Sequence, residues 1–206
     1  MPVVQAEVAA LVVQLADSRS GKRRAAARKL RAVADPSAAP GILAALRYEV
    51  GNRRTWETQY QMIMALAASR PSAEAVLFLE RLLVRDDLEP MVHLAASDAI
   101  VRSSQNAHAA VLAALGSNSL PRAEGAIRAL AMTRSVPTEA TIEAVIQYAN
   151  QPAHQQVRFW VAAAAAGWRG ASVRPFLEQC LDDNSAHTRR AAQAALECRY
   201  LKWNPL

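Results

Sequence analysis

The chain has 206 residues, of which 52% are hydrophobic and only 5% aromatic, and it carries a formal net charge of +6. Its longest strongly apolar stretch, FWVAAAAAGW, is much shorter than the roughly 20 residues of a membrane span, so no membrane-spanning helix is expected. Two cysteines are too few for a disulfide framework, and MPVVQAEV lacks the basic start of a signal peptide, so a cytoplasmic location is expected. The positive charge suits a partner with an acidic or mixed surface, or nucleic acid.

Helical segments of roughly 12 to 18 residues follow one another along the chain and are separated by turn signals. Alanine, the best helix former, makes up much of the apolar content, and no run of alternating β-branched residues predicts a strand. The sequence therefore predicts an all-α protein. The turn signals are Asp35-Pro36, Arg70-Pro71, Gly116, Val136-Pro137, Gln151-Pro152 and Gly170.

One helical segment recurs along the chain, and its copies share a small apolar face. Their last residues lie 30–36 positions apart, and the residue just before the last one is alanine in every copy except the first. Neighbouring helices need such a face in order to stack closely. The copies are RRAAARKL (23–30), QYQMIMAL (59–66), HLAASDAI (93–100), AEGAIRAL (123–130), RFWVAAAA (158–165) and RRAAQAAL (189–196).

Each copy follows another apolar helix, such as VAALVVQLA before the first copy and VRPFLEQCL before the last. Because one pair of helices cannot bury its apolar face alone, the pairs are expected to stack into a solenoid that forms one domain over residues 1–206. The approximate limits of the six repeats are 1–34, 35–69, 70–104, 105–134, 135–169 and 170–206.

These pairs resemble HEAT repeats, in which an aspartate ends the first helix and Val-Arg with a run of alanines opens the second. Asp183 and Arg189 match that pattern in the last repeat, Asp17 and Arg23 match it in the first, and the third has His93 in place of the arginine. The second and fourth repeats lack both charges, which predicts a broken aspartate–arginine ladder there. Tetratricopeptide repeats, the main competing architecture, have a strict 34-residue period that these spacings violate.

The resemblance implies a right-handed α-solenoid of about six helix pairs, in which the second helices line a concave groove. Because a helix turns about 100° per residue, the face opposite the buried alanines follows from the spacing. It presents Arg24, Arg28 and Arg31, then Tyr60 and Met64, Leu94 and Asp98, Glu124 and Arg128, Phe159, and Arg190 and Glu197, with Trp56 and Trp160 at its border.

Tyr60, Met64, Leu94 and Phe159 are expected to form an apolar middle of this face, with arginines towards the ends. Exposed apolar patches on soluble proteins mark binding surfaces, and aromatic residues, methionine and arginine are enriched at interfaces. The alternative interpretation is that these residues belong to the core. The basic segment 18–31 either contacts phosphates or an acidic surface, or only caps the array.

The pattern favours a non-catalytic scaffold or adaptor that binds a protein in its groove, without a metal or a cofactor. The histidines, His93, His108, His154 and His187, show no metal-ligand spacing and no His-Glu pair, and the two cysteines, Cys180 and Cys198, are expected to be core thiols. An immunity or inhibitor protein is a further alternative.

The main rival is a nucleic-acid-binding protein that resembles the HEAT-like DNA glycosylases for alkylated purines. Those enzymes carry a catalytic aspartate and tryptophans on a basic concave face. Here the acids on that face are Asp98 and Glu124 and the tryptophans are Trp56 and Trp160, but no motif of that family carries over residue by residue.

Overall fold

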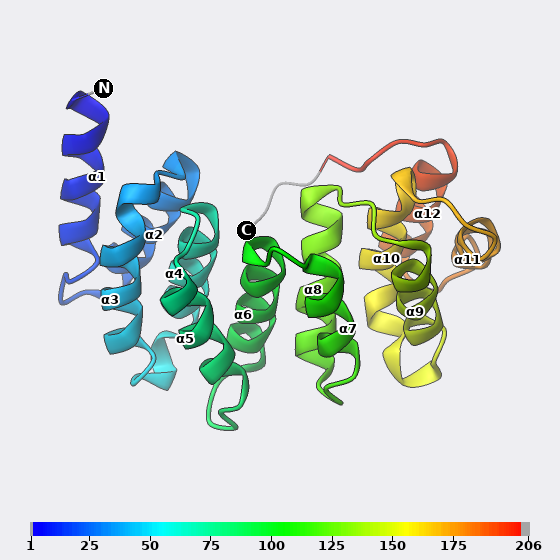
Figure 1. The fold of residues 1–206 in the computed structure, drawn as a ribbon, viewed down its shortest axis with the longest axis horizontal. Helices are drawn as coiled ribbons and strands as arrows, with labels where there is room; N and C mark the ends of the chain where they lie inside the picture. Colours follow the sequence, from blue (N-terminus) through cyan, green and yellow to red (C-terminus); the bar gives the residue numbers. More distant parts are fainter. Residues whose placement is uncertain (1, 203–206) are drawn as a thin grey trace. The chain divides into compact units, whose positions relative to one another are not determined.

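The computed structural model describes residues 2–202, with side chains described from Gln5 onward. Within these residues the chain forms twelve α-helices and four 3-10 helices and no β-strand, which confirms the all-α prediction (Figure 1). The helices form two compact units, residues 1–105 and residues 106–206, called here the N-terminal and C-terminal units. Each is an α-solenoid segment of stacked helix pairs. One continuous repeat domain remains a prediction.

The N-terminal unit contains three helix pairs, in which α1 packs on α2, α3 on α4, and α5 on α6. The second helices α2, α4 and α6 stack side by side in that order (Figure 1). The helices are α1 (Pro2–Gln14), α2 (Ser20–Val33), α3 (Ala39–Glu49), α4 (Trp56–Ala68), α5 (Ala73–Leu83) and α6 (Pro90–Ser103), and the 3-10 helices are η1 (Pro36–Ala38) and η2 (Arg53–Thr55).

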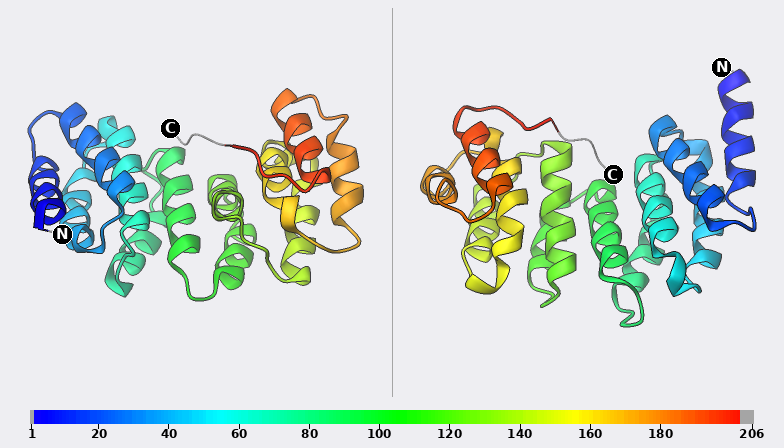
Figure 2. Two further views of the ribbon diagram at one scale, coloured as in Figure 1. Left: turned by 90° about the horizontal axis from the view of Figure 1, so that it is seen from above. Right: turned by 180° about the vertical axis from the view of Figure 1, so that it is seen from behind.

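The C-terminal unit repeats this arrangement, with α7 packed on α8, α9 on α10, and α11 on α12. Its second helices α8, α10 and α12 are again neighbours, as the two further views in Figure 2 show. The helices are α7 (Ala107–Leu115), α8 (Leu120–Thr133), α9 (Glu139–Ala149), α10 (Arg158–Ala164), α11 (Val173–Cys180) and α12 (Ala186–Leu196), and the 3-10 helices are η3 (Pro152–Val157) and η4 (Ala165–Gly167).

The small residues of the repeated face lie at the contacts between stacked helices. Ala65, Ala99, Ala129 and Ala164 are all fully buried, whereas Lys29, the one exception in the sequence pattern, is exposed. Alanine has no side chain beyond Cβ, so it lets two helix backbones approach closely without a cavity. The alanine positions therefore hold the second helices of each unit together.

In the first and last repeats, the first residue of the recurring segment fixes the turn that precedes its helix. Arg23 Nη1 donates to the carbonyl oxygens of Asp17 (2.8 Å) and Ser18 (3.0 Å). In the last repeat, Arg189 Nη1 donates in the same way to the carbonyl oxygens of Asp183 (2.7 Å) and Asn184 (3.0 Å). These bonds satisfy carbonyls that would otherwise lack a partner at the turn.

Two repeats without the arginine use a different donor for the same purpose. His93 Nε2 lies 2.8 Å from the Arg85 carbonyl oxygen and must donate to it, because a carbonyl only accepts. In the second repeat, Gln59 Nε2 donates to the carbonyl oxygens of Glu49 (3.2 Å) and Asn52 (2.8 Å). The missing charges in this repeat thus do not leave its turn unsupported.

Candidate binding surfaces

The predicted face residues divide between the two units, and the arginines of α2 belong to the N-terminal one. Arg24 forms an ion pair with Glu57 on α4, Arg28 is exposed, and Arg31 is half-buried. Trp56, at the start of α4, is partly buried and packs against the core. Arg24, Arg28 and Arg31 are called the α2 face below, and Arg28 is its most accessible cation.

The expected apolar middle is not exposed, and that part of the prediction is wrong. Tyr60, Met64 and Leu94 are only 6%, 2% and 6% exposed. α4 lies between α2 and α6 and packs on α3, and every one of its side chains from Thr58 to Leu66 is buried. The projected face of α4 thus belongs to the core in this structure.

Asp98 is also buried, which corrects its expected place as an accessible acid of the groove. Its side chain is fully buried and forms an ion pair with Arg102, one turn further along α6. Arg102 Nη2 also donates to Asp98 Oδ2 (3.4 Å), so the guanidinium reaches both carboxylate oxygens. The carboxylate has a cationic partner within its own helix.

In the C-terminal unit, α8 and α10 bring together four of the residues that the sequence places on the face. Glu124, Arg128, Phe159 and Trp160 form this group, called the Trp160 cluster below. Trp160 Nε1 donates to Glu124 Oε1 (3.2 Å), and the Arg128 guanidinium lies 5.6 Å from the centre of the Trp160 ring. Phe159 meets Trp160 edge to face at 4.8 Å between ring centres.

Burial gives the Trp160 cluster its electrostatic character. The partial burial of Glu124 raises the pKa of its carboxyl group, although the hydrogen bond from Trp160 and the charge of Arg128 act in the opposite direction. Arg128 is itself only 4% exposed, unlike the accessible arginine predicted at this position. The cluster is therefore mainly an internal brace between α8 and α10.

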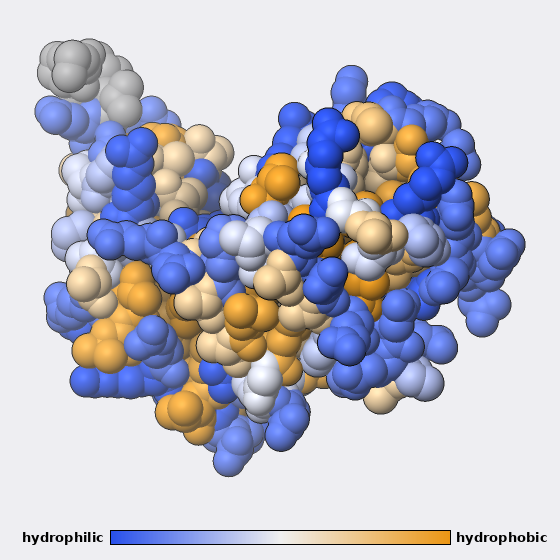
Figure 3. Space-filling model, turned by 45° about the vertical axis from the view of Figure 1, so that its right-hand side comes forward, coloured by the Kyte–Doolittle hydropathy of each residue, from blue (hydrophilic) through white to orange (hydrophobic). Residues whose placement is uncertain are grey.

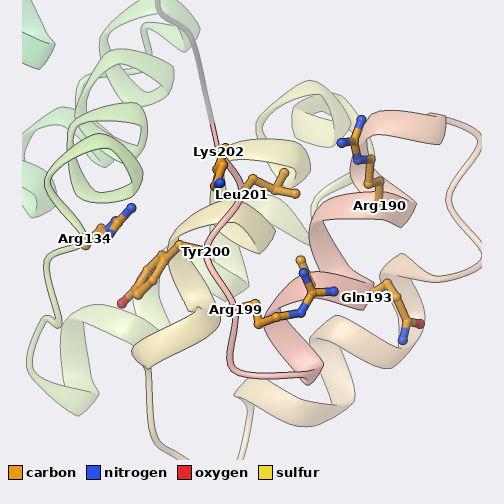
Figure 4. A pocket seen from close by; sticks show the side chains of 8 residues that line it. Arg134, Arg190, Gln193, Arg199, Tyr200, Leu201 and Lys202 are labelled. Atoms are coloured by element: carbon orange, nitrogen blue, oxygen red, sulfur yellow. The ribbon is translucent and has the colours of Figure 1, made fainter.

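Residues 199–202 run back across the C-terminal unit after α12 ends (Figure 4). The Arg134 guanidinium lies over the Tyr200 ring, 5.0 Å from its centre. The Tyr200 hydroxyl lies against Gly167, which has no side chain to displace it. Arg134 directly follows the last residue of α8 and has a left-handed backbone conformation (φ 54°), which turns the chain at the end of the helix.

A pocket of about 640 Å³ lies between this segment, α12 and the end of α8 (Figure 4). Four cations line it, and Gln193, Ala194, Tyr200 and Leu201 complete the wall. The four cations are Arg134, Arg190, Arg199 and Lys202, and the pocket that they line is called the cationic pocket below. Only Arg190 among them was predicted from the sequence, because residues 199–202 show no repeat pattern and Arg134 lies outside the helical periodicity.

Most of the positive charge in the cationic pocket is not neutralised. Arg199 Nε donates to Glu197 Oε2 (2.9 Å), and Gln193 Nε2 donates to Glu197 Oε1 (2.7 Å). The hydrogen bond from Gln193 and, to a smaller extent, the one from Arg199 lower the pKa of the Glu197 carboxyl group. Among the described residues, Arg134, Arg190 and Lys202 form no ion pair.

Exposed apolar residues are dispersed over the described part of the chain. The large ones come from different helices and turns, and on the face drawn in Figure 3 hydrophobic residues surface in small groups between hydrophilic ones. They include Val13, Tyr48, Leu77, Val84, Leu112 and Val136. The candidate binding surfaces therefore differ from the rest of the described surface in their charge more than in their exposed apolar area.

Neither a cluster of metal ligands nor a membrane-spanning helix is found among the described residues. No group of three or more histidine, cysteine, aspartate or glutamate side chains gathers there in a way that would hold a metal ion. No helix among those residues combines the length and the apolar character that a membrane span requires.

Comparisons with known proteins find likeness only among solved structures. No protein-family model matches the chain, and no curated protein matches it. The chain is similar to a designed armadillo repeat protein, YIII(Dq)4CqI, with 17% sequence identity, a TM-score of 0.37, and coverage of 91% of this chain and 98% of that one. It is also similar to an engineered protein, with 21% identity, a TM-score of 0.40, and coverage of 93% and 57%. Neither likeness carries an argument about function.

Proposed function

We propose that this chain is a HEAT-type scaffold or adaptor that binds a protein with an acidic or mixed surface and catalyses no reaction. The observation that carries the proposal is the set of unneutralised cations in the cationic pocket, held by packed helices and by the Tyr200 contact with Arg134. Arg28, exposed on α2, adds a second cationic position in the N-terminal unit.

The proposed mechanism is preorganisation. Binding costs free energy wherever side chains and loops must become ordered, and a rigid surface avoids part of that cost. The alanines between stacked helices are fully buried, and the turns are fixed by side-chain hydrogen bonds from Arg23, Gln59, His93 and Arg189. A partner would therefore meet cations whose supporting backbone is already ordered.

A non-catalytic role is favoured by the state of the acids. A general base or nucleophile must reach its substrate, whereas Asp98 is fully buried and paired with Arg102. Glu124 is already engaged by the Trp160 indole. Of the two acids that the sequence places on the face, a glycosylase-like role would have to use Glu124, whose carboxyl pKa is raised by burial.

Nucleic-acid binding is the second candidate, because arginine-rich surfaces also bind phosphates. The test that separates the two is a pull-down from host lysate with the full chain as bait, with and without nuclease, at low and high salt. If the chain is a scaffold, we expect the bait to retain a defined protein after nuclease treatment. Nucleic acid that is released steeply as salt rises, with no protein left after nuclease, would contradict it. A single protein retained even at high salt would favour the immunity or inhibitor role.

A further inference from the structure

We propose that the cationic pocket of the C-terminal unit binds an extended acidic segment of the partner protein, with several carboxylates of that segment reaching Arg190, Lys202 and Arg134. This inference rests on the proposed scaffold function and adds the place and the chemistry of recognition. It concerns only residues 106–206.

The charge in the pocket sets the chemistry of the ligand. Four cations line it, and one described carboxylate, Glu197, pairs with one of them, Arg199. Arg190 and Lys202 are exposed and make no ion pair with a described residue, so a ligand can reach both. Arginine presents a planar fork of donors that matches the two oxygens of a carboxylate. A ligand with more than one negative charge is therefore required to match the site.

The spread of the cations favours an extended ligand over a small anion. Figure 4 shows Arg134 on one side of the pocket, Lys202 on the segment that crosses it, and Arg190 on α12 at the other side. These side chains line a volume of about 640 Å³ and do not converge on one point. Carboxylates spaced along a peptide can meet each cation in turn, whereas a single phosphate would leave most of them unpaired.

The aromatic lining argues against single-stranded nucleic acid as the ligand. Such strands bind grooves in which bases stack on open aromatic rings beside the cations. Tyr200 is the aromatic residue that lines the pocket, and the Arg134 guanidinium already lies over its ring. The adjoining small cavity, which Phe159 and Trp160 help to line, has a volume of only about 30 Å³, too small for a base. Charge without a stacking surface suits an acidic peptide.

Fluorescence anisotropy on the full chain tests this inference with a labelled peptide of alternating glutamate and glycine. The pocket variant is Arg190→Ala with Lys202→Ala. The matched control is Arg169→Ala with Arg174→Ala, which removes the same charge from exposed positions of the same unit outside the pocket. We expect the pocket variant to bind the peptide about five- to tenfold more weakly, and the control to bind it like the unchanged protein. A peptide with glutamine in place of glutamate should not bind.

Three outcomes would overturn the inference. The first is no binding of the glutamate peptide by the unchanged protein, and the second is equal weakening by the pocket variant and the control. The third is tighter binding of a single-stranded oligothymidine than of the peptide. In the first two cases a protein retained in the nuclease-treated pull-down would still support the scaffold function, so the two proposals fail separately. Circular dichroism melts of both variants check that the fold is intact.

Discussion

Arg23 and Glu49 form a two-point ion pair that joins the first helix pair to the second. Arg23 Nε lies 2.7 Å from Glu49 Oε2, and Arg23 Nη2 donates to Glu49 Oε1 at 2.9 Å. Glu49 is only 2% exposed, and the hydrogen bond and charge of Glu49 raise the pKa of the Arg23 guanidinium. Arg23 also holds the turn before α2, so one side chain supports both a turn and a contact between repeats.

Arg23→Ala is expected to destabilise the protein by about 3–5 kcal/mol, because it leaves the Glu49 carboxylate buried without its partner. Urea unfolding followed by circular dichroism measures the loss. Arg24→Ala is the matched control, since Arg24 pairs with Glu57 at a largely accessible site and should cost less than about 1 kcal/mol. A similar loss for both variants would contradict the assigned role of the pair.

Gln59→Ala is expected to cost about 1–3 kcal/mol, because the buried Gln59 side chain loses its two hydrogen bonds to the carbonyl oxygens of Glu49 and Asn52, which tie the turn to α4. The same unfolding experiment on Gln193→Ala provides the comparison. Gln193 is exposed and donates only to Glu197 on the surface, so its loss should stay within about 0.5 kcal/mol. If Gln59→Ala were equally mild, the turn would not depend on this side chain.

Gly167→Ala is expected to displace Tyr200, because a Cβ at residue 167 would overlap the Tyr200 hydroxyl. The displaced segment should be cleaved by trypsin after Arg199 several times faster than in the unchanged protein. Tyr200→Phe should rescue it, since the added Cβ would lie 3.5 Å from Cζ of the ring, an ordinary contact. Equal cleavage of the single and double variants would mean that this contact does not hold the segment.

Cys180 and Cys198 are expected to differ in reactivity, although the sequence placed both in the core. Cys180 is fully buried, and burial raises the pKa of its thiol to about 11, whereas Cys198 is exposed. Iodoacetamide at pH 8 should therefore modify Cys198 in the folded protein and reach Cys180 only after unfolding, as peptide mass analysis would show. Modification of both thiols at equal rates would contradict the packing of α11.

The Cys180 thiol also predicts a pH dependence of stability. Its folded pKa of about 11 lies above the ordinary value of 9.0, so the fold favours the neutral thiol. This contribution is fully present below pH 9 and is lost as the pH rises towards 11. Thermal melts should show that raising the pH from 9 to 11 lowers the melting temperature less in Cys180→Ala than in Cys198→Ser, because Cys198→Ser keeps the buried thiol. Parallel losses in both variants would contradict the assignment.

The sequence was sufficient to predict the helix pairs, because alanine periodicity depends only on the geometry of the helix and on close packing. Ala65 and Ala99 are buried where that pattern places them. The exposure of Tyr60 and Met64 was predicted wrongly, since helical projection gives the direction of a side chain but not what covers it. Gln59 and His93 were missed as turn donors because their chemistry differs from that of the arginine they replace.

The cationic pocket was beyond sequence reasoning for a related reason. Arg134, Arg199 and Lys202 lie outside the repeated helices, and only the course of residues 199–202 brings them beside Arg190 on α12. No local pattern encodes that course. It depends on the fit of Tyr200 between Arg134 and Gly167, which are far from it in sequence.

If charged side chains on this scaffold recognise a protein, a quantitative pull-down from nuclease-treated host lysate should reveal it. The baits are the unchanged chain, Arg28→Ala, the pocket variant Arg190→Ala with Lys202→Ala, and the control Arg169→Ala with Arg174→Ala. We expect a protein that the unchanged chain and the control retain in equal amounts, and that the pocket variant retains in an amount about fivefold lower or less. Equal retention by every bait, or the disappearance of all bound protein after nuclease treatment, would contradict it.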